Sequence, residues 1–180
     1  MAPVAGTRGD YREALRSSAV LERLAAFDPH VAGTLPLGVD VEDSDIDVLC
    51  CAPDPARFAT VLWEAFSDHD GFAMHQWTGG DQAVVARFDW QGWPFEIFGS
   101  PQPVREQRGW RHFEIERRLL ALGGEPLRAA ALSERRAGLK TEPAFARVLG
   151  LAGDPYEALL TLQRLPDRDL AARLAALQRG

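Results

Sequence analysis

The feature that most constrains the fold is the segment GTLPLGVDVEDSDIDVLC, residues 33–50, in which carboxylates lead into an apolar run. The run IDVLC has the apolar, β-branched character of a buried strand. Asp45 and Asp47 stand two residues apart at its start, so on a strand both project to the same face. Ionised carboxylates are costly to bury unless they are paired or bind a cation. The segment therefore predicts a strand with a charged site at its beginning.

Local patterns predict the elements on either side of this strand. Apolar residues at helical spacing predict an amphipathic helix over residues 10–27, and GTLPLG is expected to form a turn. Asp54 followed by Pro55 predicts the start of a second helix, which Gly71 is expected to end. Three extended runs follow, and the last two predict a β-hairpin. Further helices are expected at residues 103–122, 126–137, 143–149, 155–162 and 167–178.

This order of elements predicts an α+β fold. A mixed β-sheet is expected at about residues 28–100, backed by helices and followed by an all-helical C-terminal region. We expect residues 1–100 to form the core and residues 101–180 to form a helical region packed on it. Composition supports a folded chain, because 46% hydrophobic and 26% charged residues are close to the averages of globular proteins.

The charge balance limits the class of partner. The formal net charge is -6, which argues against a long nucleic acid, because such binding draws on clustered cations. The two cysteines, Cys50 and Cys51, are adjacent and form neither a disulfide framework nor a metal motif. The sequence shows no signal peptide and no run of the ~20 apolar residues that a membrane span needs. We therefore expect a cytoplasmic protein without a membrane partner.

The carboxylates at the start of the strand suit a divalent cation. Hard oxygen ligands favour Mg²⁺, which takes one or two protein carboxylates together with substrate phosphates. Gly33 allows the backbone to approach a phosphate closely, and Thr34 offers a hydroxyl beside it. Glu96 lies in another apolar run, WPFEIFG, and repeats the anomaly of Asp45 and Asp47. The pattern predicts a cleft that holds a metal and a phosphate group.

These residues resemble the motif of the nucleotidyltransferase superfamily with the DNA polymerase beta-like fold. That motif is a Gly-Ser or Gly-Thr pair, a second glycine, and Ser-Asp-x-Asp entering a strand, with a third carboxylate on a later strand. The matching positions are Gly33, Thr34, Gly38, Ser44, Asp45, Asp47 and, with glutamate for the more frequent aspartate, Glu96. A closer resemblance, carried by SDIDVLC, FEIFG and GLKTEPAFARVLGLAGDPYEALL, is to a small bacterial family with a domain-of-unknown-function label.

The resemblance implies a role for each of these residues. Asp45 and Asp47 would ligate two Mg²⁺ ions, with Mn²⁺ as an alternative. Glu96 would complete the site or help to deprotonate the acceptor hydroxyl. Gly33 and Thr34 would hold the β- and γ-phosphates. Further nucleotide contacts are expected from Gly38, Ser44, Arg105, Arg108 and Lys140.

The implied activity is transfer of a nucleoside monophosphate from an NTP, ATP foremost, to a hydroxyl. The acidic charge favours a small molecule or a protein side chain over an RNA end as the acceptor. The alternative is a catalytically inactive nucleotide-sensing or structural module with the same fold. All three carboxylates are retained, which favours the enzyme, because a binding module has no need to hold costly charges together. Pyrophosphate transfer, as in alarmone synthetases, is disfavoured because the other motifs of that group are missing from the sequence.

Each acidic candidate also has a purely structural interpretation. Asp45 and Asp47 can serve as turn and capping residues before a strand. Glu96 can face solvent on an edge strand, and a threonine beside glycine in a turn, such as Thr34, needs no ligand. The glycine loop next to the aspartates favours the metal site.

The basic residues of the helical region are open to two interpretations. Arg105, Arg108 and Arg111 recur every three residues, which predicts that they lie along one side of one helix. They can contact phosphate or form a solvated face that pairs with the glutamates at positions 106, 114 and 116, and we favour the solvated face. His112 is interpreted as a packing or surface residue, while Lys140 can reach a phosphate from the helical region.

Overall fold

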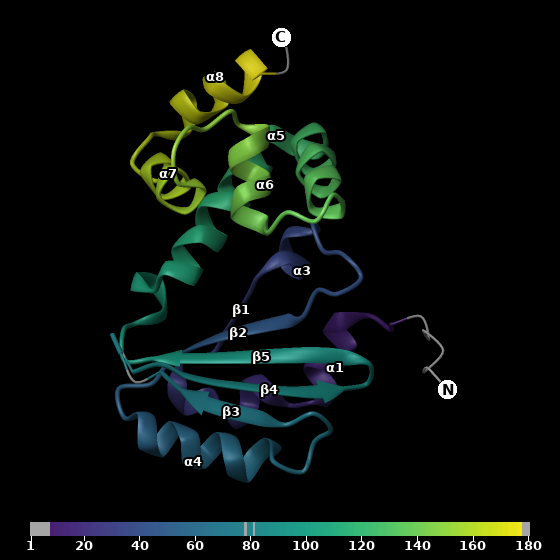
Figure 1. The fold of residues 1–180 in the computed structure, drawn as a ribbon, viewed down its shortest axis with the longest axis vertical. Coiled ribbons are helices and arrows are strands. Elements are labelled where there is room, and N and C mark those ends of the chain that lie inside the picture. Colours follow the sequence, from purple (N-terminus) through teal and green to yellow (C-terminus); the bar gives the residue numbers. More distant parts are fainter. Residues whose placement is uncertain (1–7, 78, 81, 178–180) are drawn as a thin grey trace. The chain divides into compact units, whose positions relative to one another are not determined.

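The computed structural model describes residues 8–77, 79–80 and 82–177 (Figure 1). The chain divides into two compact units, each with its own core. The first, called the sheet unit here, is Met1–Gly33 with Asp45–Gln107, and the second, the helical unit, is Thr34–Ser44 with Arg108–Gly180. The functional division of the chain at residue 100 stays a prediction.

The sheet unit is built on a sheet of five strands. They are β1 (His30–Ala32), β2 (Ile46–Cys51), β3 (Ala73–Gln76), β4 (Val84–Trp90) and β5 (Trp93–Ser100). The order across the sheet is β1-β2-β5-β4-β3, in which β2 and β5 run parallel and the other neighbours are antiparallel. The predicted mixed sheet and the β4–β5 hairpin are confirmed, and the fold class is α+β.

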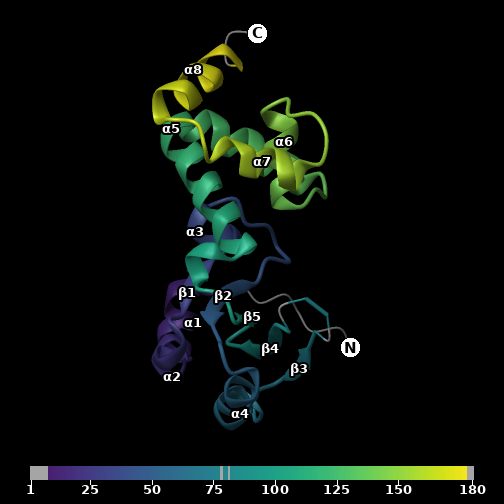
Figure 2. The same ribbon diagram turned by 90° about the vertical axis from the view of Figure 1, so that its left-hand side faces the viewer.

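The core of the sheet unit lies between one face of the sheet and α4 (Pro55–Phe66), which begins as predicted (Figure 2). The side chain of Asp54 accepts a hydrogen bond from the Arg57 N–H at 3.0 Å and so caps this helix. Phe66 of α4 stacks on Phe88 of β4, and Phe88 stacks on Phe95 of β5, with ring centroids 4.7 and 4.8 Å apart. This aromatic stack leaves the opposite face of the sheet for the charged residues.

The predicted first helix over residues 10–27 is wrong in one respect, because the helix is interrupted at Ala19. The segment forms α1 (Tyr11–Ser17), α2 (Val20–Arg23) and the 3₁₀ turn η1 (Ala25–Phe27). Ala19 adopts a left-handed conformation with φ 53°, which ends helical geometry there. The residue that follows, Val20, is fully buried. The break therefore turns the chain so that its apolar side faces the core.

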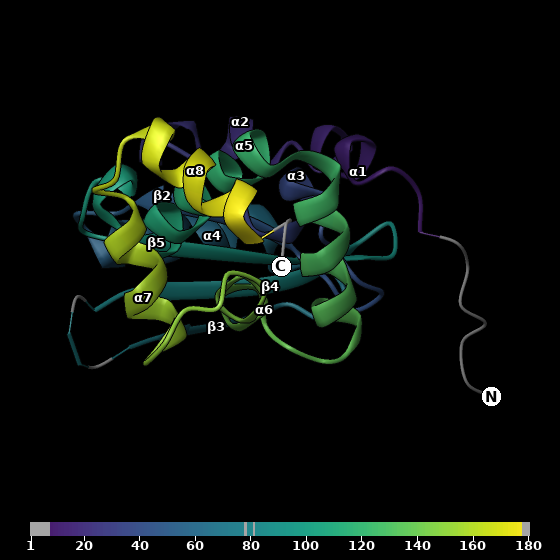
Figure 3. The same cartoon turned by 90° about the horizontal axis from the view of Figure 1, so that it is seen from above.

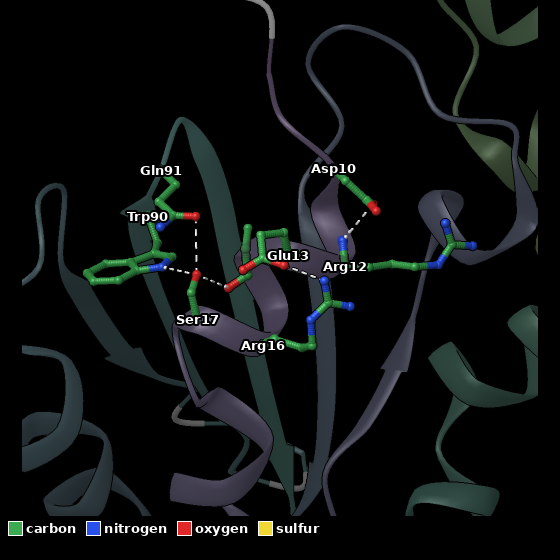
Figure 4. A network of polar contacts seen from close by, with 8 residues as sticks. Asp10, Arg12, Glu13, Arg16, Ser17, Trp90 and Gln91 are labelled. Carbon is green, nitrogen blue, oxygen red and sulfur yellow. Dashed lines mark hydrogen bonds and ion pairs between the residues drawn. The ribbon is translucent and has the colours of Figure 1, made fainter.

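Polar contacts attach the end of α1 to the β4–β5 hairpin (Figure 4). The Ser17 hydroxyl donates to Oε1 of Gln91 at 3.1 Å and accepts a hydrogen bond from Nε1 of Trp90 at 3.0 Å. At the other end of α1, the Asp10 side chain accepts the N–H of Arg12 at 3.0 Å and caps the helix. Trp90 and Gln91 are distant from Ser17 in sequence, so local periodicity could not reveal where the helix stops.

The helical unit contains α3 (Thr34–Leu37), α5 (Arg108–Arg136), α6 (Thr141–Val148), α7 (Pro155–Leu162) and α8 (Asp167–Leu177). Helix α3 is a single helical turn where the sequence predicted an irregular turn. Two predicted helices are joined in α5, which is interrupted at Gly124 (φ 61°, ψ -156°), just before Pro126. Helices α6 and α7 lie side by side (Figure 3). Within the described part of the chain, no helix is both long enough and apolar enough to cross a membrane.

Candidate active site

Two of the predicted carboxylates are direct neighbours on adjacent strands. Asp47 of β2 and Glu96 of β5 are register partners in the parallel pair, so their side chains project to the same face. That face is opposite the aromatic stack, because the residues before and after them, such as Ile46 and Phe95, are buried in the core. Asp45 precedes β2 by one residue and, like Asp47, is half-buried. The parallel pairing thus brings together acidic residues that are far apart in sequence.

Gly33 fits closely against the carboxylate of Asp47. Its φ of +77° lies in the left-handed region, and a Cβ built on it would lie 1.9 Å from Oδ2 of Asp47. Any side chain at this position would collide with the carboxylate. A glycine is therefore required at position 33, first of all, to make room for the carboxylate of Asp47. The sequence had suggested a different reason, the close approach of a phosphate.

Arg87 is a member of this cluster that the sequence analysis missed. It lies on β4 opposite Glu96, and both its Nε, at 2.8 Å, and its Nη2 donate to Oε2 of that carboxylate. Its pKa is raised, chiefly by this hydrogen bond and by the charge of Glu96, with smaller contributions from Asp45 and Asp47. The guanidinium therefore lies in the electrostatic field of all three carboxylates.

A signal in the sequence could have located Arg87. It is a charged residue in the otherwise apolar strand AVVARF. The turn at Gln91 and Gly92, both with positive φ, pairs Trp90 with Trp93, and counting back from that pair places Arg87 opposite Glu96.

The donor set of the cluster fits a hard divalent cation, but its present arrangement is not a three-ligand site. Among the residues that the structure describes, no group of three or more His, Cys, Asp or Glu side chains is placed to hold a metal ion. Glu96 is held by Arg87 instead. Carboxylate oxygens are the ligands that Mg²⁺ prefers, so Asp45 and Asp47 are the residues suited to hold one, with Glu96 as a third ligand once it leaves Arg87.

The loop between Gly33 and Asp45, which belongs to the helical unit, is closed by a pair of hydroxyls. Thr34 donates to Oγ of Ser44 at 3.1 Å, and the N–H of Val41 donates to the same oxygen at 2.9 Å. Both hydroxyl residues are buried. Gly38, with φ +68°, packs against the side chain of Arg128. These contacts give Thr34, Gly38 and Ser44 a structural role in shaping the loop.

The predicted row of arginines on one helix is wrong. Arg105 lies in the 3₁₀ turn η2 (Val104–Glu106), and an extended residue, Gln107, separates it from the start of α5. Arg108 is exposed and donates to Oε1 of Glu157 at 2.7 Å. The side chain of Arg111 donates to Oε1 of Gln163 at 3.1 and 3.0 Å, so these two arginines pair with α7 and the residue after it. Lys140 is exposed immediately before α6.

Comparison with known proteins identifies one matching family. It carries the description Domain of unknown function (DUF4269) and matches residues 13–162. No curated protein matches the sequence. The expected closer resemblance to a family of unknown function is thereby confirmed.

Solved structures with a similar fold are nucleotidyltransferases. A structure of Cid1, described as having RNA terminal uridylyl transferase activity, gives a TM-score of 0.56 at 14% identity over 77% of this chain and 45% of that chain. The GLD-2/RNP-8 complex gives 0.55 at 9% identity over 94% and 74%. The Cid1 poly(U) polymerase with Mg 3'-dATP bound gives 0.54 at 16% identity over 85% and 47%. The present chain spans about half the length of the Cid1 structures, and the likeness shows that it has the nucleotidyltransferase fold.

Proposed function

The chain belongs to the DUF4269 family, and from its nucleotidyltransferase fold and its carboxylate cluster we propose that it transfers a nucleoside monophosphate from an NTP to a hydroxyl group. The observation that carries the proposal is that Asp47 lies directly beside Glu96 on the sheet face opposite the core. Gly33 lies against Asp47, and Asp45 precedes it by two residues. A strand face that served packing alone would carry apolar residues at these positions, because removing a carboxylate from water costs free energy.

In the proposed reaction, Asp45 and Asp47 would hold Mg²⁺ through their carboxylate oxygens. The bound metal would lower the pKa of the acceptor hydroxyl and stabilise charge on the transferred phosphoryl group. Glu96 completes the set or accepts the proton of that hydroxyl. Support for a metal and a nucleotide comes from the Cid1 poly(U) polymerase, which was solved with Mg 3'-dATP. Mn²⁺ is the natural substitute, because it takes the same oxygen ligands.

The nucleotide contacts that the sequence predicted belong to the same proposal. The backbone at Gly33 contacts the triphosphate, and Thr34 follows it directly in the chain. Arg105, Arg108 and Lys140 are exposed and can supply countercharge. ATP is the first nucleotide to test. We propose a small molecule or a protein side chain as the acceptor, because the net charge of -6 disfavours a long RNA.

A second candidate is a nucleotide-binding module without turnover. The ion pair between Arg87 and Glu96 favours it, because the guanidinium occupies the carboxylate that would be the third metal ligand. The two candidates differ in their products. The enzyme releases pyrophosphate and transfers the nucleoside monophosphate, whereas the module returns the nucleotide unchanged.

The first experiment is a thermal-shift panel of ATP, GTP, CTP and UTP, each with and without Mg²⁺. The wild type is compared with Asp45→Asn/Asp47→Asn and with Asp43→Asn, an exposed carboxylate of the same segment, as the matched control. A ligand at ~100 times its dissociation constant stabilises a fold by ~2.7 kcal/mol. For a chain of this size, that raises the melting temperature by about 5–10 °C.

A metal-dependent rise in the wild type and in Asp43→Asn, lost in the double variant, supports the nucleotide site. Pyrophosphate release in the presence of candidate acceptors then separates the enzyme from the module. If no nucleotide raises the melting temperature with Mg²⁺, or if the double variant responds as the wild type does, the proposed site is wrong.

A further inference from the structure

A second polar cluster lies inside the helical unit. His112 and Glu116 stand one turn apart on α5, and each has only 4% of its surface exposed. Glu142, in the first turn of α6, and Tyr156, at the start of α7, lie around the same turn of α5. Oε1 of Glu142 is 3.6 Å from Nδ1 of His112, and the ring of Tyr156 is 5.7 Å from the imidazole ring. Three helices thus converge on buried titratable groups outside the proposed active site.

The cluster contains buried polar atoms without hydrogen-bond partners. Within the described residues, Oε1 of Glu116 and Nδ1 of His112 are buried and have no hydrogen-bond partner. The separation of 3.6 Å between Nδ1 and Oε1 of Glu142 is longer than a hydrogen bond. A buried polar atom without a partner is costly, so native proteins satisfy nearly all of them. A ligand that donates hydrogen bonds to these two atoms would remove this cost.

The protonation states of these residues follow from burial. Desolvation raises the pKa of Glu116 well above its usual value, and the charge of Glu142 adds to the effect, while Arg135 opposes it. Desolvation also lowers the pKa of His112, in the same direction as Arg108 and Arg111 and against Glu142 and Glu157. A neutral imidazole with its proton on Nε2 presents Nδ1 as an acceptor.

The nearby arginines are committed to other partners. Arg108 donates to Glu157, and Arg111 donates to Gln163. Arg135 donates to the carbonyl oxygens of Leu139, at 3.0 Å, and Val39, at 3.4 Å. None of these three arginines therefore donates a hydrogen bond to Oε1 of Glu116 or Nδ1 of His112.

We propose that the cluster of His112, Glu116 and Glu142 binds a primary ammonium group of a small ligand. An ammonium group has three N–H donors and no acceptor, which matches one unpartnered oxygen, one unpartnered nitrogen and a neighbouring carboxylate. Two glutamates disfavour an anion. A metal ion is disfavoured because no group of three such side chains in the described residues is placed to hold one. The inference does not depend on the proposed transferase activity.

The test compares methylammonium chloride with tetramethylammonium chloride, on the full chain at equal ionic strength and neutral pH. Both probes carry one positive charge, but only methylammonium donates hydrogen bonds. At about ten times its dissociation constant, methylammonium is expected to raise the melting temperature by about 3–6 °C. Glu116→Gln and Glu142→Gln are expected to lose this rise, whereas Glu114→Gln, a more exposed glutamate of the same helix, keeps it.

A second readout follows the imidazole directly. Long-range ¹H–¹⁵N spectra are expected to show the Nδ1 resonance of His112 shifting with methylammonium and not with tetramethylammonium. His112→Gln assigns that resonance among the four histidines of the chain. Equal responses to the two salts, or an unchanged Nδ1 resonance, would overturn the proposal. A buried water would then be the donor to Oε1 of Glu116 and Nδ1 of His112. Neither result would bear on nucleotide binding, which the Asp45→Asn/Asp47→Asn variant tests separately.

Discussion

At the scale of single residues, close packing limits which side chains the candidate site can accommodate. The carboxylate of Asp47 fits against Gly33 because that residue has no Cβ. Buried charge is the other constraint at this scale, since Glu116 is 4% exposed and in the field of Glu142. Each of these constraints predicts how a single substitution changes stability.

Gly33→Ala is expected to displace the carboxylate of Asp47. Alanine would have to adopt the left-handed φ of +77°, and its Cβ would lie 1.9 Å from Oδ2 of Asp47. We therefore expect the unfolding free energy to fall by about 2–4 kcal/mol and the thermal shift with Mg²⁺-nucleotide to be lost. Gly92→Ala is the matched control, because Gly92 has φ +78° and no atom within 4 Å of its Cβ. It should lose only about 1–2 kcal/mol. Equal losses in urea titrations of the two variants would contradict the collision.

Glu116→Gln is expected to make the unfolding free energy less sensitive to pH. Because burial raises the pKa of Glu116 in the folded state, its contribution is fully present below about pH 4.3, the unfolded value, and is lost as pH rises through the folded pKa. The variant should therefore gain stability relative to wild type as pH increases from about 4 to 8. Urea titrations across this range measure the difference, and Glu114→Gln should show no such trend.

At the scale of elements, pairing of strands and bending of helices decide which residues meet. The β4–β5 register places Arg87 opposite Glu96, and the β2–β5 register places Asp47 beside it. In the helical unit, Gly124 interrupts α5 with a conformation open essentially to glycine alone. These features link residues that local spacing does not connect.

Arg87→Gln is expected to tighten binding of Mn²⁺ to the nucleotide-free protein. The change removes a positive charge close to the carboxylates and releases Glu96 from its ion pair. The side chain of Arg87 is 63% exposed, so solvent screens the effect, and we expect a gain of about 3- to 10-fold. Electron paramagnetic resonance of Mn²⁺ measures it. Arg117→Gln, which breaks the exposed pair with Glu114, is the control and should bind as wild type does. A weaker site in Arg87→Gln would mean that the arginine orients the ligands instead.

Gly124→Ala and Gly109→Ala should change stability in opposite directions, although both residues lie in α5. Alanine at position 124 must adopt φ 61° with ψ -156°, which costs about 1–3 kcal/mol. Gly109 is an exposed residue in the first turn and does not have a positive φ, so alanine there should add about 0.5–1 kcal/mol. Urea titrations measure both changes. Stabilisation by Gly124→Ala would show that the bend is not required.

At the scale of the whole molecule, the net charge bears on which partners are favoured. Twenty-six acidic residues against twenty lysines and arginines give the net charge of -6. A molecule with this balance releases few counterions from a polyphosphate chain, whereas a small nucleotide with its own metal meets no such barrier.

We expect no measurable binding of an RNA of about 20 nucleotides at about 0.15 M salt, because the phosphate backbone meets too few cations. Fluorescence anisotropy of a labelled RNA measures this, with Mg²⁺ present in every sample. The thermal shift with Mg²⁺-ATP on the same preparation serves as the control for a competent protein. Micromolar affinity for the RNA at this salt concentration would show that the acidic balance does not exclude an RNA acceptor.

The elements whose signals are local could be predicted from the sequence. Asp54 with Pro55 marks the start of α4, and Asp154 with Pro155 marks the start of α7 in the same way. The carboxylates of the candidate site were visible because Asp47 and Glu96 interrupt apolar strands and Asp45 directly precedes one. In contrast, the interruption at Ala19 could not be predicted, because the helical spacing of the apolar residues continues across it.

The sequence by itself determined the mixed sheet, the hairpin and the presence of acidic residues at the start of β2, because alternation, turn residues and caps act over a few neighbouring positions. Only the tertiary structure decided what those residues contact. It placed Asp47 beside Glu96 and against Gly33, and it buried Glu116 beside Glu142. Burial and electrostatic partners are set by side chains from other elements, and the spacing within one segment carries no information about them.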